Sequence, residues 1–381
     1  MKKKFLIVST VPTTLNFFGG QINFLNKTFD VELVSSPDDM LYGIAEREGV
    51  NAHAVKMVRE ISLLKDLKSL FQLIVLFKKL KPHIVHGNTP KGGLLSMTAS
   101  WVARVPRRIY YVHGLRYEGD IGFKRKILKN IERLSCYLAT DIISVSHGVK
   151  ENMAKDSITS KTPHIIGNGS ANGINPNKFS RENIEHEGLK EKYNISETDL
   201  LFGYVGRLVG DKGINELITV FSELNKTYSH IKLLLVGWYE ELLDPLKVHI
   251  KQEIISNNNI IAVGGQDDVR PFLNIMDVFV FPSYREGFGV SIMEAAAMDL
   301  PVICSNISGC NEIIMEGYNG KLVTAKSKAE LSNAMELFIN NPEKITEMKG
   351  VTRSYVLKKY NQETVWKEAL KTYETISFPD K

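Results

Sequence analysis

The sequence predicts an α/β fold with two Rossmann-like domains, whose parallel sheets face each other across a cleft. Short β-rich apolar runs alternate with longer amphipathic stretches along the chain, which is the pattern of repeated βαβ units. The length of 381 residues exceeds what one core usually organises, while 43% hydrophobic and 24% charged residues are ordinary globular values. We therefore expect two domains.

The expected strands are spaced as βαβ units require, with helical patterns between them. In the first half they cover residues 4–8, 31–35, 83–86, 109–113, 142–146 and 164–166. In the second half they cover residues 200–205, 232–236, 260–263, 278–281, 302–305 and 321–323.

A polar segment separates the two halves. Residues 172–199 contain Pro176 and a charge-dense run, and are therefore the expected linker. The domains would then span residues 1–171 and 200–360. The last segment, residues 361–381, keeps helical periodicity as far as Ile376 and is expected to pack back on the first domain.

Charge and cysteine content narrow the possible classes of protein. The first apolar run, residues 5–8, is too short for a signal or membrane helix. Three cysteines without Cys-x-x-Cys spacing argue against a disulfide framework or a structural zinc site and fit a reducing cytosol. The net charge of +5 divides into +11 for residues 1–170 and −6 for the remainder. Such a basic half can face nucleic acid, anionic lipid or a phosphorylated substrate.

Ligands of open α/β sheets bind beyond the carboxyl ends of the strands, so the loops there are the places to search. The first such loop contains Gly19 and Gly20, whose lack of side chains lets a backbone approach a diphosphate. A glycine pair is more often an ordinary turn, however. Neither G-x-G-x-x-G nor G-x-x-x-x-G-K-[ST] occurs, which disfavours a dehydrogenase and a P-loop ATPase.

A second loop, after residues 200–205, combines two cations with glycines. It contains Gly206, Arg207 and Lys212. Arg207 can bind phosphate oxygens through two parallel hydrogen bonds, and Lys212 adds a mobile charge that would neutralise a departing diphosphate. The alternative is a solvated basic turn, but the flanking glycines and the dipole of the following helix favour phosphate binding.

A third loop carries two carboxylates eight residues apart, Glu286 and Glu294. If a helix begins near Gly289, Glu294 lies within it, while Glu286 stays in the loop beside the exposed N–H groups of Phe288 to Ser291. One acid can bind sugar hydroxyls and the other ribose hydroxyls. Alternatively, the two are a helix-surface acid and a capping acid. A glutamate inside an Ala-rich, buried helix nevertheless needs a partner.

Together these segments resemble the retaining GT-B glycosyltransferases of family 4, whose signature of Glu, seven residues and Glu is matched by Glu286 and Glu294. The resemblance covers nearly the whole chain, since other segments follow in family order: residues 82–86, 142–146, 206–207, 212–213, 278–283, 301–303 and 317–320. Two further segments, residues 113–118 and 168–174, resemble enzymes that build capsular or lipopolysaccharide repeat units on a lipid carrier. Asp299 stands where relatives usually place glycine, which suggests a changed helix C-terminal turn.

The resemblance implies a role for each matching residue. Glu286 would hold the hydroxyls of the transferred sugar, Glu294 the ribose, and Arg207 and Lys212 the diphosphate. His113, at a strand end of the first domain, matches a residue that lies against the donor sugar; a lone histidine there is structural about as often as functional. Backbone groups of the donor site would come from Gly19, Gly20, Gly206, Phe288, Gly289 and Val290.

The resemblance also implies a mechanism. Retention in this family is thought to need no protein nucleophile, so stabilisation of the leaving diphosphate by Arg207, Lys212 and the N–H groups near Gly289 is the main catalytic contribution. No Asp-x-Asp triplet is present. We therefore expect no metal and no cofactor, with a UDP-sugar as donor and a hexose or N-acetylhexosamine as the transferred sugar.

The expected acceptor is a polyprenyl-diphosphate-linked saccharide, bound by the first domain at the inner face of the cytoplasmic membrane. Residues 63–81 mix bulky apolar residues with lysines, although the run 67–80 taken alone favours a helix packed on the sheet with solvated lysines. The summed charge favours peripheral contact with anionic lipid. Nucleic acid is disfavoured, because no exposed aromatic platforms interleave with the basic residues.

Two alternatives remain open from the sequence. A UDP-sugar epimerase of the same architecture would bind the same donor without an acceptor. A non-catalytic nucleotide-sugar sensor or scaffold would need no intact set of Arg207, Lys212, Glu286 and Glu294, and the presence of all four therefore favours an enzyme.

Overall fold

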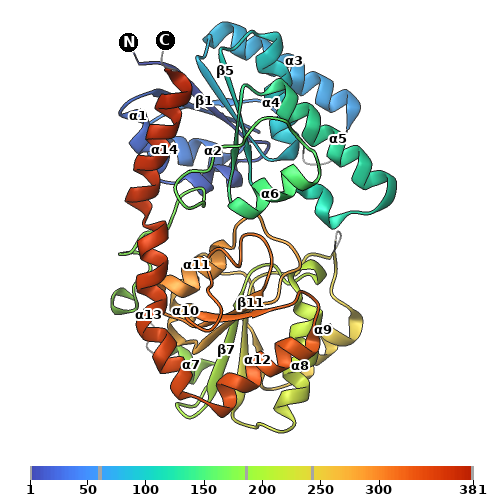
Figure 1. The fold of residues 1–381 in the computed structure, drawn as a ribbon, viewed down its shortest axis with the longest axis vertical. Helices are drawn as coiled ribbons and strands as arrows, with labels where there is room; N and C mark the ends of the chain where they lie inside the picture. Colours follow the sequence, from blue (N-terminus) through green and yellow to red (C-terminus); the bar gives the residue numbers. More distant parts are fainter. Residues whose placement is uncertain (1, 59–61, 185–187, 242–243, 379–381) are drawn as a thin grey trace. The chain divides into compact units, whose positions relative to one another are not determined.

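The computed structural model describes residues 2–58, 62–184, 188–241 and 244–378 (Figure 1). The chain divides into two compact units. The first takes in the residues up to Gly173 together with those from Gln362 onward, and the second takes in Ile174–Asn361. Each unit has a parallel sheet covered by helices, so the predicted α/β fold class is confirmed.

Within the described residues, the first unit has a six-stranded parallel sheet in the order β3-β2-β1-β4-β5-β6. Ile7 of β1 aligns with Leu33 on one side and with His86 on the other. Strands covered on both faces consist of almost continuous apolar residues, and Phe5 to Val8 are accordingly buried. The strands are β1 (Lys4–Val8), β2 (Asp30–Ser35), β3 (Asn51–Ala54), β4 (Ile84–Asn88), β5 (Arg107–Val112) and β6 (Asp141–Ser144).

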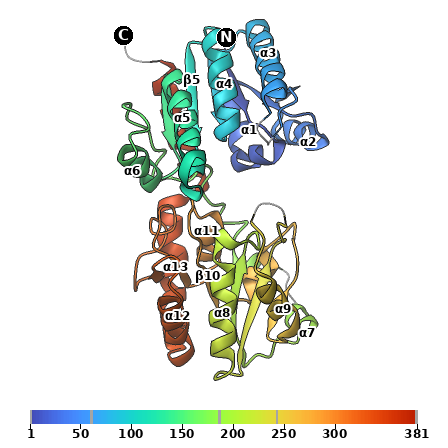
Figure 2. The ribbon, with the colours of Figure 1, turned by 90° about the vertical axis from the view of Figure 1, so that its right-hand side faces the viewer.

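The helices of the first unit cover both faces of its sheet. They are α1 (Gln21–Asn26), α2 (Asp39–Glu48), α3 (Leu63–Leu80), α4 (Pro90–Val102), α5 (Gly122–Leu138), α6 (His147–Lys155) and α14 (Gln362–Ser377). Figure 2 shows α3, α4 and α5 side by side on one face. There α4 packs so closely on β5 that a Cβ at Gly93 would lie 2.1 Å from the Tyr110 ring. Tyr111 points to the opposite face, where α14 contacts β1 through the rings of Tyr373 and Phe5.

Within the described residues, the second unit repeats this topology with the order β12-β11-β10-β7-β8-β9. In both sheets the chain reverses its direction of sheet growth beside the first strand: between β1 and β4 in one, and between β7 and β10 in the other. Such topological switch points open a crevice at the carboxyl edge of a sheet. The strands are β7 (Leu200–Val205), β8 (Ile231–Val236), β9 (Ile260–Ala262), β10 (Val278–Phe281), β11 (Val302–Ser305) and β12 (Gly320–Val323).

The segment that precedes β7 is part of the second unit. Ile174 donates its backbone N–H to Tyr360, and Arg181 donates to the carbonyls of Met298, at 2.6 Å, and Met276, at 3.2 Å. The expected linker was residues 172–199; its residues from Ile174 onward belong to the second unit and are tied to this sheet along part of their length, while residues 185–187 lie outside the described residues. The helices are α7 (Leu189–Lys192), α8 (Ile214–Asn225), α9 (Val248–Ser256), α10 (Arg270–Ile275), α11 (Val290–Ala297), α12 (Lys328–Asn340) and α13 (Glu343–Tyr360).

One strand prediction is wrong, and one strand of the first sheet was not predicted. Residues 164–166 form no strand, because His164 makes only a single bridge to Ile143 beside β6. Conversely β3, with the sequence Asn-Ala-His-Ala, was not predicted. It is an edge strand of polar and small residues and lacks the apolar run on which the prediction depended.

The terminal segment belongs to the first unit. Residues 362–377 form α14, in which Trp366 donates to Asn172 at 2.6 Å and its ring lies 5.6 Å from that of Phe24 in α1. Residues 379–381 of the expected segment lie outside the described residues. At the end of α11, Asp299 adopts the left-handed conformation at φ 62°, where glycine is the common residue.

Candidate functional site

The carboxyl edge of the second sheet brings two predicted site residues into contact. Lys212 lies in the loop after β7 and Glu286 in the loop after β10, and these strands are neighbours. The Lys212 ammonium forms an ion pair with the Glu286 carboxylate. Only 17% and 13% of the two side chains are exposed, so both charges are held at the switch point with little access to water.

Close backbone packing and a second ion pair hold these two loops together. A Cβ at Gly213, where φ is 73°, would lie 2.1 Å from the carbonyl oxygen of Pro282. Arg285 Nη2 donates to Asp211 Oδ2 at 2.6 Å, and the backbone N–H of Tyr284 donates to the Asp211 carbonyl at 2.8 Å. Asp211 and Arg285 therefore fix the approach of Lys212 and Glu286.

Arg207 lies at the end of the central strand β7, next to the same edge. Its Nη1 donates to Glu240 Oε2 at 3.1 Å, and 40% of its side chain is exposed. Glu240 follows β8, and the loops are joined by the Leu208 N–H, which donates to the Trp238 carbonyl at 2.9 Å. Gly206 precedes Arg207 with φ 153°, and a Cβ there would lie 2.7 Å from the Tyr204 hydroxyl.

The start of α11 presents free N–H groups, but Gly289 and Val290, two of the residues expected to supply them, use theirs within the second unit. The Gly289 N–H donates to the Gly309 carbonyl and the Val290 N–H to the Phe288 carbonyl, each at 3.0 Å. Phe288 itself is buried. Within the described residues, no acceptor lies at the N–H groups of Ser291 and Ile292. These are the donors that an anion would meet at this helix terminus.

Glu294 lies inside α11, as predicted. Its carboxylate makes no hydrogen bond within the described residues, and burial raises its pKa to about 7, with Lys178 opposing this shift and Asp268 adding to it. It forms no ion pair with Lys212 or Arg207 in the described part of the chain. A glutamate inside this helix needs a partner, and Glu294 has none among the described residues.

In the first unit, His113 follows β5 and contacts other polar and aromatic groups. Its Nε2 lies 2.9 Å from Asn88 Oδ1, and its ring stacks on Tyr111 at a centroid distance of 4.5 Å. Burial lowers the pKa of His113 to about 3, so the imidazole is neutral at physiological pH.

Gly19 and Gly20 have structural partners in their own unit. The Gly20 N–H donates to both carboxylate oxygens of Glu48 at 3.0 Å, and the Gly19 N–H donates to the Asn16 carbonyl at 3.1 Å. Gly20 has φ 76°, and a Cβ there would lie 2.7 Å from the Trp366 ring. Both N–H groups therefore already have an acceptor within the first unit.

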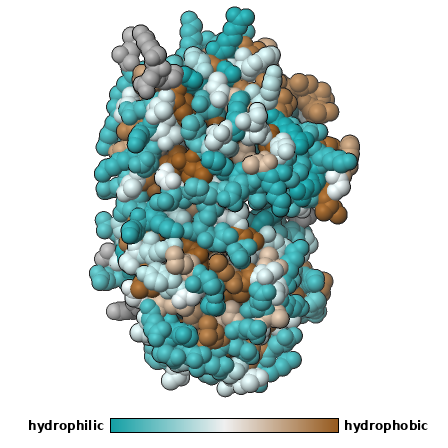
Figure 3. Space-filling view, viewed as in Figure 1, coloured by the Kyte–Doolittle hydropathy of each residue, from teal (hydrophilic) through white to brown (hydrophobic). Residues whose placement is uncertain are grey.

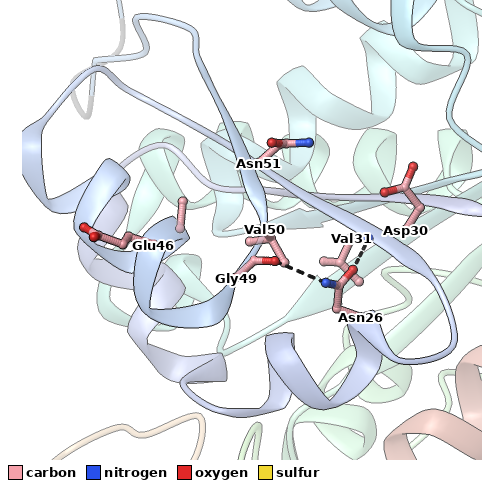
Figure 4. Close-up of a pocket in the computed structure, with 8 residues that line it drawn as sticks. Asn26, Asp30, Val31, Glu46, Gly49, Val50 and Asn51 are labelled. Carbon is pink, nitrogen blue, oxygen red and sulfur yellow. Dashed lines mark hydrogen bonds between the residues drawn. The ribbon is translucent and has the colours of Figure 1, made fainter.

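A cavity of about 250 Å³ lies elsewhere in the first unit (Figure 4). It is lined by polar residues that include Asn26, Asp30, Glu46 and Asn51. Asp30 and Asn51 begin β2 and β3, so the cavity lies at the amino edge of the sheet. His113 lies at the carboxyl edge, and the cavity is therefore separate from the predicted site residues.

Two further features concern metals and membranes. In residues 2–58, 62–184, 188–241 and 244–378, no three His, Cys, Asp or Glu side chains gather as metal ligands would. Among the same residues, no helix combines the length and apolar character needed to cross a bilayer.

Sequence reasoning missed four residues at the two edges, namely Glu240, Asp211, Arg285 and Asn88. Each owes its place to the sheet order, which puts loops distant in sequence side by side. Strand-end loops could have been searched for acids near Arg207, but only knowledge that β8 neighbours β7 would have selected Glu240.

Comparison with known families gives two matches that follow each other along the chain. Residues 11–146 match the family described as glycosyl transferase 4-like, and residues 185–354 match the glycosyl transferases group 1. The two matched segments contain His113 in the first and Arg207, Lys212, Glu286 and Glu294 in the second.

Relatives with assigned names are also similar over most of their length. The capsular polysaccharide biosynthesis glycosyltransferase CapM of Staphylococcus aureus is 35% identical over 98% of this chain and 97% of that protein. The UDP-Gal:alpha-D-GlcNAc-diphosphoundecaprenol alpha-1,3-galactosyltransferase of Escherichia coli is 31% identical over 85% of this chain and 82% of its own. An N,N'-diacetylbacillosaminyl-diphospho-undecaprenol alpha-1,3-N-acetylgalactosaminyltransferase of Campylobacter jejuni is 26% identical over 81% of each.

Solved structures share the fold. HepE of Anabaena in complex with UDP-glucose superimposes with a TM-score of 0.81 at 17% identity, covering 98% of this chain and 100% of that one. WaaG, involved in lipopolysaccharide biosynthesis, gives 0.72 at 14% identity over 97% and 98% of the two chains.

Proposed function

We propose a donor, an acceptor and a mechanism for this chain from one premise: it belongs to the group 1 glycosyltransferases, shares their GT-B fold and is a glycosyltransferase. The named relatives support transfer and lend no support to an epimerase or a scaffold. Family membership alone does not specify the donor or the acceptor, which depend on the residues of the site.

The donor is a nucleoside diphosphate sugar held by the second unit, with UDP as the nucleotide. The observation that carries this proposal is the contact between Lys212 and Glu286 at the switch point of the second sheet. The carboxylates of Glu286 and Glu240 neutralise Lys212 and Arg207. A diphosphate would take over both cations and leave Glu286 to accept hydrogen bonds from sugar hydroxyls. UDP is favoured because the E. coli relative is named for UDP-Gal and HepE was solved with UDP-glucose.

Glu294 and the start of α11 complete the donor site in this proposal. The unpartnered Glu294 carboxylate would accept the hydroxyls of the ribose. The N–H groups of Ser291 and Ile292 would donate to phosphate oxygens at the positive end of α11. His113 of the first unit would contact the transferred sugar.

The transfer proceeds with retention and without a protein nucleophile. The acceptor hydroxyl attacks the anomeric carbon on the face from which the diphosphate leaves, and its proton passes to the departing phosphate oxygen. Charge builds up on that phosphate, and Lys212, Arg207 and the α11 N–H groups would stabilise it. These positive groups supply the stabilisation that a divalent cation gives in metal-dependent transferases, so the reaction needs no metal.

The acceptor is a saccharide linked to a lipid diphosphate, and the product is a longer saccharide for a bacterial surface polysaccharide. Two relatives are named for diphosphoundecaprenol acceptors, and the S. aureus relative is named for capsule synthesis. The first unit would bind this acceptor.

An exposed apolar row on the first unit supports contact with the inner face of the cytoplasmic membrane. Leu73 and Phe77 of α3 pack inward, but Leu64, Leu67 and Phe71 are 84%, 62% and 68% exposed. Ile121 and Phe123 at the start of α5 are also exposed. Figure 3 shows hydrophobic atoms at the right-hand edge of this unit, where Figure 1 places α3 and α5. Lysines interleave with these residues, a pattern that suits an anionic lipid surface.

A binding and transfer experiment tests the proposal. Thermal shifts of the full chain would be measured with UDP, GDP, ADP and their common sugar conjugates, each with and without EDTA. Donors that bind would then be incubated with a synthetic GlcNAc-diphospho-polyprenol, and the anomeric configuration of the product would be read by NMR. We expect a UDP-selective shift that survives EDTA, followed by a retained linkage. A shift lost in EDTA contradicts metal independence, and UDP release without a glycosylated lipid contradicts the acceptor.

A further inference from the structure

A chain of hydrogen bonds runs through the first unit from α14 to His113. The Tyr373 hydroxyl lies 3.1 Å from His86 Nε2, His86 Nδ1 lies 3.1 Å from Asn88 Nδ2, and Asn88 Oδ1 lies 2.9 Å from His113 Nε2. Tyr373, His86 and Asn88 are each at most 1% exposed. The chain therefore links a buried helix contact to the partly exposed histidine at the carboxyl edge of the sheet.

The orientation of the Asn88 amide is fixed by the backbone of β1. Asn88 Nδ2 lies 3.1 Å from the Val8 carbonyl oxygen. A carbonyl can only accept a hydrogen bond, so the amide nitrogen must face Val8 and the amide oxygen must face His113. The second hydrogen on Nδ2 points toward His86, whose Nδ1 lies at 3.1 Å and whose carbonyl lies at 3.4 Å.

This orientation sets the tautomers of both histidines. Because Asn88 donates to His86 Nδ1, that nitrogen carries no proton, and His86 donates from Nε2 to the Tyr373 hydroxyl. Because Asn88 Oδ1 can only accept, His113 must carry its proton on Nε2. His113 Nδ1 is then an acceptor, and no donor in the described part of the chain is hydrogen-bonded to it.

The surroundings keep both rings uncharged. Burial lowers the pKa of each imidazole to about 3, and in His86 the neighbouring His113 adds to this effect. The groups packed against the two rings are aromatic: Phe5, Phe17, Phe18, Tyr111 and Tyr373. Within the described residues, no charged side chain hydrogen-bonds to either ring.

We propose that Asn88 is a positioning residue that holds His113 as its Nε2–H tautomer, so that His113 Nδ1 accepts a hydrogen bond from a hydroxyl of the transferred sugar. The sugar contact rests on the proposed function, while the tautomer control stands on the geometry of the free protein. Asn88 acts through His113 and touches no substrate.

The first test reads the tautomer directly. Side-chain nitrogen NMR of the full chain labelled with ¹⁵N-histidine would be recorded without donor, with His113→Gln used to assign the signal. We expect the wild-type His113 to show the Nε2–H pattern. Asn88→Leu removes the acceptor and should mix the two tautomers. A wild-type Nδ1–H pattern, or an unchanged pattern in Asn88→Leu, would overturn the proposal.

Tyr373→Phe is the matched control. It removes the other end of the same chain and leaves a buried His86 Nε2–H without its acceptor, so it lowers the melting temperature. The Val8 carbonyl still orients Asn88 in this variant, and the His113 pattern should stay as in the wild type. A tautomer change in Tyr373→Phe would show that general loosening of the unit moves His113, which contradicts control by Asn88.

Asn88→Asp gives a second variant of nearly unchanged shape. The new carboxylate still accepts from His113 Nε2–H, but its charge raises the pKa of His113 well above about 3. Protonation then blocks Nδ1, so transfer should fall as the pH drops through the raised pKa, and this acid limb should be absent in the wild type. Its absence in a folded Asn88→Asp enzyme, with His113 titrating by NMR, would overturn the sugar contact.

Kinetics separates this inference from the proposed function. With an active UDP-sugar and the lipid-diphosphate acceptor, Asn88→Leu should lower kcat/KM about tenfold, the equivalent of one hydrogen bond. Unchanged kcat/KM beside a mixed tautomer would overturn the role in sugar recognition and leave the transferase intact. If the wild type transfers no sugar at all, the proposed function fails, and the NMR result still decides whether Asn88 holds His113.

Discussion

The two sheets share one topology but place different chemistry at their switch points. In the first unit, the ends of β1 and β4 carry Val8 and Asn88, which are joined to His86 and His113 by hydrogen bonds between neutral groups. In the second, the loops after β7 and β10 carry Lys212 and Glu286, which form an ion pair. The same crevice is therefore neutral in one unit and charged in the other.

The difference separates two tasks of a sugar transferase. A diphosphate needs cations and free N–H groups, and the second edge offers Lys212, Arg207 and the N–H groups of Ser291 and Ile292. At the first edge, the predicted phosphate donor Gly20 N–H already binds Glu48. In the proposed function, the sugar hydroxyls meet one acceptor from each edge, the Glu286 carboxylate and His113 Nδ1. The second unit should thus dominate nucleotide affinity.

The largest expected effect comes from Lys212→Ala. Loss of the cation nearest the switch point should lower kcat by about 10²–10³, the usual range for removing one donor to a developing anion. The measurement is the initial rate of UDP release with acceptor, alongside the melting temperature. Lys321→Ala is the matched control, because Lys321 also pairs with a glutamate, Glu316, on the same unit. It should retain full activity, and an equal loss there would contradict a specific role for Lys212.

Glu286→Gln should have the next largest effect. The amide keeps the shape of the side chain but removes a charged acceptor, which is worth about 1.5–3 kcal/mol, or roughly 10- to 150-fold in kcat/KM. UDP affinity should change much less, because the carboxylate is proposed to contact the sugar. Isothermal titration with UDP and with the UDP-sugar separates the two. Glu316→Gln serves as the control, and a loss of UDP affinity equal to that for the UDP-sugar would refute the assignment.

Two glutamates with raised pKa values, one in each unit, extend the comparison of the two units to its pH dependence. Burial raises the pKa of Glu294 and of Glu132 to about 7, and Glu132 accepts a hydrogen bond from Tyr110 at 2.7 Å. A raised folded-state pKa means that ionisation destabilises the fold as the pH rises from about 4.5 to about 7.

Glu294→Gln and Glu132→Gln should therefore each raise the melting temperature at pH 8 and leave it nearly unchanged at pH 4.5. The rise in pKa from 4.5 to about 7 corresponds to a change of at most about 3 kcal/mol in the free energy of unfolding. Only Glu294→Gln should weaken UDP binding, since Glu132 lies in α5 of the first unit. Equal weakening by both variants would contradict the ribose contact.

The smallest effect is expected at Asp299. Its left-handed conformation costs a non-glycine residue about 1–2 kcal/mol, but its Oδ1 accepts from the Arg353 N–H at 3.2 Å. Asp299→Gly relieves the strain and loses the hydrogen bond, so stability should change by about 1 kcal/mol or less. Activity should be unaffected, as the departure from the family pattern concerns only the turn after α11. A large loss of turnover would show that this turn positions the site.

The sequence predicted most strands because strands of a doubly covered sheet consist of apolar runs, as in β7 and β10. It missed β3, whose residues are polar or small, and wrongly predicted a strand at residues 164–166. Loop motifs identified Lys212 and Glu286 singly. Their contact, and the clamp formed by Asp211 and Arg285, depend on β7 lying beside β10, which no local pattern encodes.

The sequence does not reveal which N–H groups already have hydrogen-bond acceptors in the folded chain. Glycines at Gly20 and Gly289 suggested phosphate donors, yet both N–H groups bond within their own unit, to Glu48 and to the Gly309 carbonyl. Asn88 carried no motif, because its importance comes from a backbone carbonyl 80 residues away in the sequence. A sequence motif shows which residue types are present. Whether their N–H groups have acceptors depends on how the strands and loops pack in the folded sheet.

The most direct test of the account is UDP binding to the full chain in EDTA, measured by isothermal titration for the wild type, Lys212→Ala and His113→Gln. The charged edge of the second unit should hold the nucleotide, and the neutral edge of the first should not. We therefore expect UDP affinity to fall at least about tenfold in Lys212→Ala, as for the loss of a charged hydrogen bond, and to stay within about twofold in His113→Gln. Unchanged affinity in Lys212→Ala, or an equal loss in His113→Gln, would contradict this division of labour.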